Sequence, residues 1–183
     1  MAKKGEQTKQ AIREISYGLF AKYGFKDVTM SMICEATGLS RGGLYRHYSS
    51  TAAIFSEILS EEYSFDERMN NNDSAKKILL DTLAIIEEEI MDKEKSLSLA
   101  IYEYASISED GIFETINENA KNRWKKLIEY GIKNKEFKNV DANQIAEMIL
   151  YYYQGLRMWS RVVPFTKNVA ENYSKNICDL VLR

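Results

Sequence analysis

The side chains best suited to contact a polyanion stand together in the run SRGGLYRHY, which begins at Ser40. Arg41 can pair with a guanine edge through two hydrogen bonds, and Tyr45 and His47 can donate hydrogen bonds to phosphates. The run therefore predicts contact with nucleic acid. A surface helix of a helical bundle that happens to carry a basic face is the alternative interpretation.

The same run contains two adjacent glycines, Gly42 and Gly43. A glycine inside a helix is less favourable than alanine by about 1 kcal/mol. In the first turn, however, the backbone N–H groups are unpaired and carry the positive end of the helix dipole. Glycines there let an anionic backbone approach closely. Leu44 and Tyr48 are four residues apart, so we expect them to share the face that packs against the core.

The chain offers little for catalysis or metal binding. It has one histidine, His47, and two distant cysteines, Cys34 and Cys178, which we expect to be reduced thiols of a core. The acidic run Glu87–Glu89 is typical of a solvated helix face. We therefore predict no metal site, no cofactor and no enzyme activity, although a small helical enzyme stays an alternative.

Two short helices joined by a tight turn must position the run. Thr29 is suited to cap a helix over 30–37, Gly38-Leu39-Ser40 forms a turn, and Ser40 caps a helix over 41–48. This layout is that of a helix-turn-helix. Residues 9–23 are expected to form a preceding amphipathic helix.

The flanking segments are also expected to be helical. Gly24 is placed to end the first helix in a left-handed conformation. Ser50 can cap a fourth helix that runs to about Asn70.

Charge is distributed unevenly along the chain. Residues 1–50 hold eight Lys and Arg against four Asp and Glu, a net charge of +4, whereas the whole chain carries −2. A basic end on an acidic body indicates that this end meets a polyanion. Lys3, Lys4 and Lys9 are candidates for a flexible basic arm, with a solvated tail as the alternative.

The remaining sequence predicts further helices and no strands. The chain has 183 residues with a single proline, Pro164, so long helices are permitted throughout. We expect helices over 74–93, 96–107, 111–134, 141 to just before Pro164, and 165–182. The longest apolar run, Met148 to Tyr153, is far shorter than the roughly 20 residues that span a membrane, and no signal peptide is recognisable. We predict an all-α cytoplasmic protein without a membrane partner.

The segment Ile12–Phe55 resembles the DNA-binding domain of the TetR family of transcriptional regulators (TetR/AcrR type). The features that match in register are Phe20, Gly24-Phe25, Thr29, Ile33, Ala36, Gly38-Leu39-Ser40, Gly42, Leu44-Tyr45, His47-Tyr48 and Phe55. The resemblance implies a helix-turn-helix DNA-binding domain over 1–50, with a recognition helix over 41–48. It implies a helical effector-binding and dimerisation domain over 51–183.

The resemblance also implies roles for single residues. Thr29 caps the second helix and contacts a phosphate, and Thr51 stands where the family often has a lysine, so a charge is lost there. The DNA-contacting set is Thr29, Ser40, Arg41, Gly42, Gly43, Tyr45, His47 and Thr51.

Residues of the second domain are harder to assign. Aromatic and methionine side chains that could line an effector pocket, or only fill a core, include Tyr102, Phe113, Trp124, Tyr152 and Met158. Glu103, between two tyrosines, could favour a cationic ligand, with a solvated glutamate as the alternative. Apolar seams on the last two helices suggest a dimer interface, with a purely intramolecular core as the alternative; they comprise Tyr152, Leu156, Trp159, Val169, Tyr173, Ile177 and Leu180.

These expectations combine into one hypothesis. The chain is a homodimeric repressor that binds a double-stranded DNA operator and is released by an unknown small-molecule effector. In this hypothesis the fourth helix is the lever between the two domains. A helical interaction protein that uses the helix-turn-helix structurally is the other alternative, besides the enzyme.

Overall fold

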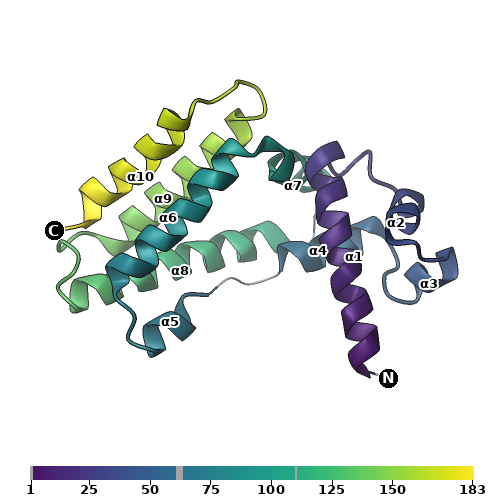
Figure 1. The fold of residues 1–183 in the computed structure, drawn as a ribbon, viewed down its shortest axis with the longest axis horizontal. Coiled ribbons are helices and arrows are strands. Elements are labelled where there is room, and N and C mark those ends of the chain that lie inside the picture. Colours follow the sequence, from purple (N-terminus) through teal and green to yellow (C-terminus); the bar gives the residue numbers. More distant parts are fainter. Residues whose placement is uncertain (1, 61–63, 110) are drawn as a thin grey trace. The chain divides into compact units, whose positions relative to one another are not determined.

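The computed structural model describes residues 2–60, 64–109 and 111–183, and nearly all regular structure in these ranges is helical (Figure 1). The all-α prediction is confirmed. The chain forms two compact units. Unit 1 comprises the described parts of Met1–Glu62 and Glu94–Ile112, and unit 2 those of Tyr63–Lys93 and Phe113–Arg183. The domain boundary at residue 50 stays a prediction.

The described part of unit 1 contains five α-helices: α1 (Ala2–Tyr23), α2 (Met30–Thr37), α3 (Arg41–Tyr45), α4 (Thr51–Leu59) and α7 (Ser98–Ala105). The first four follow the predicted order. The fifth comes from the middle of the chain, which the sequence did not indicate.

An aromatic cluster forms the centre of unit 1. The Phe20 and Phe55 rings are 4.8 Å apart, and the ring of Phe25 is 5.3 Å from that of Phe55. Tyr104 of α7 completes the cluster, with its ring 4.7 Å from that of Phe25. Such aromatic pairs add about 0.5–1.5 kcal/mol each beyond the area that they bury. The cluster therefore fixes α7 against α1, α4 and the loop after α1.

The fourth helix is shorter than predicted. It ends at Leu59, and a separate short helix, α5 (Asp66–Asn70), follows. At the end of α4 the Ser60 hydroxyl donates a hydrogen bond to the Ser56 carbonyl, and before α5 the Ser64 hydroxyl accepts one from the Asp66 N–H. Serine hydroxyls that bond to the nearby backbone compete with a continuous helix. The prediction of one helix to Asn70 was wrong, and α4 lies within unit 1.

Unit 2 is built from α5, α6 (Ala75–Met91), α8 (Ile112–Lys133), α9 (Ala142–Trp159) and α10 (Lys167–Val181). Figure 1 shows α6, α9 and α10 running alongside one another. Their shared core consists of Ile78, Leu79, Leu83, Ile90, Leu127, Ile128, Ile145, Ile149, Tyr173, Ile177 and Val181. A short 3₁₀ turn, Lys93–Lys95, precedes α7. No helix in the described ranges is long and apolar enough to cross a bilayer.

Candidate nucleic-acid interface and ligand cavity

Local hydrogen bonds fix the geometry of the helix-turn-helix. The Thr29 hydroxyl accepts from the Met32 N–H at 3.3 Å and so caps α2. Gly38 ends α2 at φ 69°, a left-handed conformation in which its N–H donates to the Glu35 carbonyl. The predicted cap of α2 at Thr29 and the predicted turn at Gly38 are both present.

Helix α3, the predicted recognition helix, is capped and ends earlier than predicted. The Ser40 hydroxyl accepts from the Gly43 N–H at 3.1 Å. Regular helix ends at Tyr45 rather than at residue 48, and the next residues form a turn in which the N–H of His47 and that of Tyr48 donate to the Leu44 carbonyl.

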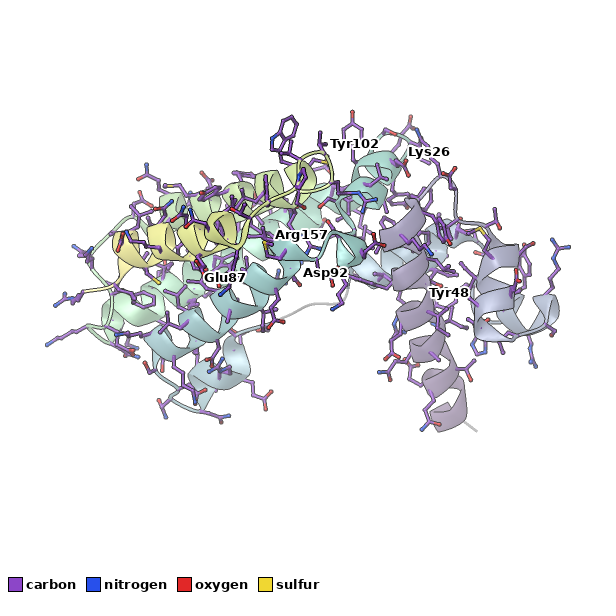
Figure 2. The ribbon with its side chains drawn as sticks, turned by 45° about the horizontal axis from the view of Figure 1, so that its top comes forward. Lys26, Tyr48, Glu87, Asp92, Tyr102 and Arg157 are labelled. Carbon is purple, nitrogen blue, oxygen red and sulfur yellow. The ribbon has the colours of Figure 1, made fainter. Side chains whose placement is uncertain are left out.

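The inner face of α3 packs as predicted. Leu44 is fully buried, as is Ile33 of α2, and Tyr48 is 4% exposed. Tyr48 lies near α1 (Figure 2), where the Lys9 ammonium is 5.2 Å from the centre of its ring. Burial raises the pKa of the Tyr48 phenol above its ordinary value. The phenol therefore stays neutral at physiological pH and serves packing.

The outer face of α3 presents polar groups to solvent. Arg41 and Gly42 are exposed, and Tyr45 is 49% exposed. One guanidinium nitrogen of Arg41 donates to the Ser31 hydroxyl of α2 at 3.3 Å. Ser31 was not among the residues predicted from the sequence. Its position on α2, the helix that precedes Arg41, could have indicated this contact.

The other predicted DNA contacts differ in exposure. Thr29 and Ser40 are exposed, whereas His47 and Thr51 are half-buried. Gly43 is buried, and a Cβ there would lie 3.2 Å from the Ser40 hydroxyl oxygen. The missing side chain at Gly43 therefore also allows the close packing of the cap.

The basic arm expected at the N-terminus is part of a helix instead. Lys9 lies on α1, and its ammonium is 3.4 Å from a carboxylate oxygen of Glu57 on α4. Arg13 pairs with the same carboxylate at 2.7 Å. The side chains of Lys3 and Lys4 lie outside those described. Lys9 is thus held by the fold of unit 1 and is not in a flexible arm.

Glu103 of α7 has a role that the sequence did not reveal. Its Oε2 accepts hydrogen bonds from the backbone N–H groups of Phe25, at 2.7 Å, and Lys26, at 3.0 Å. The Glu103 carboxylate therefore holds the loop between α1 and α2, rather than facing a ligand.

Unit 2 contains a cavity of about 360 Å³, here called the unit 2 cavity, among α6, α8, α9 and α10. Its apolar wall includes Ile86, Trp124, Ile149 and Tyr173, and its polar lining includes Glu89, Arg123 and Tyr153. Cavities of this size and composition are typical of small-molecule sites.

The predicted pocket residues are dispersed. Among them, Trp124 is the one that lines the described unit 2 cavity. Tyr102 belongs to unit 1 and is 67% exposed. Tyr152 packs its ring against that of Tyr173, and Phe113 and Met158 are half-buried elsewhere in unit 2. Sequence spacing alone could not show which aromatic side chains meet.

The seams predicted on the last two helices divide into core and surface. Tyr173 and Ile177 are buried in the core of unit 2, and Leu156 and Val169 are half-buried. Tyr152, Trp159 and Leu180 are exposed. Together with Met148 and Tyr151, two of these three residues, Tyr152 and Leu180, line an apolar groove between α9 and α10.

The described residues contain no group of three or more His, Cys, Asp or Glu side chains placed to hold a metal ion.

Comparisons with known proteins agree with this architecture. A family model described as "Bacterial regulatory proteins, tetR family" matches residues 12–58. The HTH-type transcriptional regulator AcrR of Shigella flexneri is 32% identical over 53 residues, which are 29% of this chain and 25% of that protein. The uncharacterized HTH-type transcriptional regulator YfiR of Bacillus subtilis is 34% identical over 76 residues, 41% of this chain and 36% of that protein. The matched part thus spans a quarter to about a third of these relatives.

The fold as a whole also has solved counterparts. A putative transcriptional regulator from Saccharomonospora viridis, solved in complex with choline, superposes with a TM-score of 0.73 over 97% of this chain and all of that one, at 17% identity. This similarity is one of fold and covers both units. Residues 12–58 therefore form a helix-turn-helix of the tetR family of bacterial regulatory proteins, and the chain as a whole has the fold of solved transcriptional regulators.

Proposed function

We propose that the chain is a ligand-responsive repressor that binds operator DNA as a homodimer in the cytoplasm. The observation that carries the DNA-binding part is the two-sided character of α3. Leu44 is fully buried on one side, while Arg41, Gly42 and Tyr45 are exposed on the other. A short capped helix with an exposed polar face is suited to enter a major groove.

In this proposal some residues of the helix-turn-helix contact base edges and others contact the sugar-phosphate backbone. Arg41 reads a base edge, because its guanidinium can form two parallel hydrogen bonds with guanine. Tyr45 and His47 contact the sugar-phosphate backbone, and so do Thr29 and Thr51 through their hydroxyls. The exposed Gly42 lets the N-terminal end of α3 approach closely.

Dimerisation is supported by the apolar surface of unit 2. Trp159 is 57% exposed, and Met148, Tyr151, Tyr152 and Leu180 are exposed beside one another on α9 and α10. Large apolar side chains gathered on one face are typical of a surface that is covered in the assembled protein. Two copies joined there would present two α3 helices to half-sites about 34–36 Å apart.

The unit 2 cavity is the proposed effector site. It is formed by side chains of one compact unit and has an apolar wall with a few polar groups. The choline complex of the S. viridis regulator supports a small-molecule site in a protein of this fold. A coupling of about 1–3 kcal/mol between effector and DNA suffices to lower operator affinity roughly 5- to 150-fold.

The DNA-binding part is tested by gel shift with DNA from upstream of the chain's own gene, at several salt concentrations. Arg41→Ala should relax base preference, whereas Tyr45→Phe should weaken binding to all sequences alike. Lys22→Ala is the matched control, because it removes an exposed positive charge from α1, away from α3. If both α3 variants bind like the parent, the proposed docking is wrong. Indifference of the parent chain to DNA would favour a helical interaction protein.

A further inference from the structure

We propose that Ser31 of α2 is a positioning residue for Arg41, so that both helices of the helix-turn-helix determine operator specificity. The inference rests on the proposed function in taking Arg41 as the side chain that reads a base. It adds a residue outside α3 that sets the orientation in which Arg41 meets the DNA.

The core of unit 1 fixes the backbone at both residues. Ser31 lies on α2 two residues before Ile33, and Arg41 begins α3 three residues before Leu44. Ile33 and Leu44 are fully buried, and α2 packs against α3. Because the two helices are held in this way, a hydrogen bond between the two side chains restrains the mobile end of Arg41 against a fixed point.

The two side chains meet on the exposed surface of the helix-turn-helix. Nη2 of Arg41 donates a hydrogen bond to the Ser31 hydroxyl oxygen at 3.3 Å, and both residues are exposed. Arg41 has no other hydrogen bond or ion pair among the described residues. A free arginine side chain loses much rotamer freedom when it binds. The bond to Ser31 removes part of this loss from the binding step, because it orders the guanidinium beforehand.

The hydrogen bond to Ser31 leaves Arg41 able to read a guanine. A guanidinium has five N–H groups, and the O6 and N7 atoms of guanine together accept from a neighbouring pair of them. Nη2 carries two hydrogens, one beside the Nε–H group and one beside Nη1. Whichever of them Ser31 accepts, the other still forms a parallel pair with its neighbour. Ser31 therefore orients the guanidinium and leaves one complete edge for the base.

Docking on DNA should strengthen the contact between Ser31 and Arg41. Both side chains are solvated in the free protein, where water competes for the hydrogen bond. A DNA groove excludes much of this water, and a hydrogen bond from a charged donor is stronger in such surroundings. The contribution of Ser31 should therefore be larger in the complex than in the free protein.

Two DNA duplexes that differ at a single base pair test the inference. Selection from a random DNA library, with the parent chain and with Arg41→Ala, identifies the base pair whose preference depends on Arg41. Fluorescence anisotropy then measures affinity for the preferred duplex and for one in which that base pair is exchanged. We expect Ser31→Ala to bind the preferred duplex about two- to tenfold more weakly, as for one lost hydrogen bond, and the exchanged duplex like the parent.

Two controls separate positioning from stability and from direct contact with DNA. Ser31→Thr keeps the hydroxyl and should bind both duplexes like the parent. Alanine is a better helix former than serine, so Ser31→Ala should melt no lower than the parent. When Arg41→Ala is already present, Ser31→Ala should have no further effect, because the side chain that Ser31 positions is gone.

Other outcomes would contradict the positioning role of Ser31. Equal weakening on both duplexes, or the same weakening with and without Arg41, would mean that the hydroxyl contacts DNA itself and would overturn the inference. Unchanged binding by Ser31→Ala, or an operator preference that does not depend on Arg41, would also overturn it. In these cases the parent still binds DNA, so the proposed regulator survives. A parent chain that binds no DNA would overturn the proposed function and this inference together.

Discussion

Removing the Glu103 carboxylate should loosen the start of the helix-turn-helix from a distance of almost 80 residues in sequence. In Glu103→Ala the N–H groups of Phe25 and Lys26 lose the acceptor that they share. The loop that they belong to joins α1 to Thr29, the cap of α2. The variant keeps the aromatic cluster of unit 1, because Tyr104 is untouched.

The size of the stability loss in Glu103→Ala depends on how exposed the groups that lose their hydrogen bonds are. A hydrogen bond to a charged group contributes about 1.5–3 kcal/mol when its loss leaves the partner unpaired. Lys26 is exposed and Glu103 is half-buried, so water replaces much of the lost bonding. We expect a loss of about 1–2 kcal/mol, mostly from the buried Phe25. For a chain of this size each kcal/mol corresponds to a fall in Tm of about 2–4 °C.

Amide hydrogen exchange measures the loosening directly at the two N–H groups that lose their acceptor. If the loop opens locally, the Phe25 and Lys26 amides should exchange about 5- to 30-fold faster in Glu103→Ala. Glu109→Ala, which removes an exposed carboxylate near the end of unit 1's second segment, is the control. Gly24→Ala should act in the same direction, since its Cβ would lie 2.6 Å from Oε2 of Glu103 and φ is +84°. Unchanged exchange at both amides in Glu103→Ala would refute the reasoning.

Four further substitutions test other parts of the fold. Ser40→Ala removes the cap of α3 and should destabilise unit 1 by about 1 kcal/mol, which reduces operator affinity in a gel shift. Gly131→Ala should destabilise unit 2 by about 1–3 kcal/mol in chemical denaturation, because its Cβ would overlap the Phe137 ring. Gly18→Ala, in open space on α1, should instead stabilise by up to about 1 kcal/mol. Burial alone would raise the pKa of Glu136, but hydrogen bonds from a serine hydroxyl and two backbone N–H groups at the start of α6 leave it below its ordinary value of about 4.5. The carboxylate therefore stabilises the folded state above pH 4.5 and less as pH falls further, and Glu136→Gln should flatten this acid-side fall in Tm.

The helix-turn-helix was predictable because its signals are local. Thr29 and Ser40 each accept a hydrogen bond from an N–H three residues ahead, and Gly38 supplies the left-handed turn between the helices. Each of these features depends on a few consecutive residues. The same holds for the burial of Leu44, which follows from helical periodicity alone.

The unit 2 cavity and the role of Glu103 could not be predicted in the same way. Trp124 and Tyr152 are both aromatic residues of amphipathic helices, yet one lines the cavity and the other is exposed on α9. Which of them meets a cavity depends on how distant helices pack. Glu103 was expected to face a ligand or solvent, because nothing near it in sequence indicates the backbone N–H groups of Phe25 and Lys26.

Unit 1 is formed by two separate segments of the chain, and this bears on the proposed regulation. Its segment Glu94–Ile112 is inserted between the two segments of unit 2, so the chain passes between the units three times. The hydrogen bonds that hold this segment within unit 1 include those of the Glu103 carboxylate, the one between the hydroxyls of Tyr104 and Ser56, and the one from the Tyr17 hydroxyl to the Lys95 carbonyl. In the proposed regulator, a change of shape in unit 2 would reach the helix-turn-helix through the segment that carries α7 as well as through the chain that follows α4. Since α4 ends at Leu59 within unit 1, it is not the continuous lever between two domains that we predicted from the sequence. Tyr104→Phe and Tyr17→Phe each remove the hydroxyl of one of these hydrogen bonds. This second route requires that both variants lose effector response while they keep operator binding.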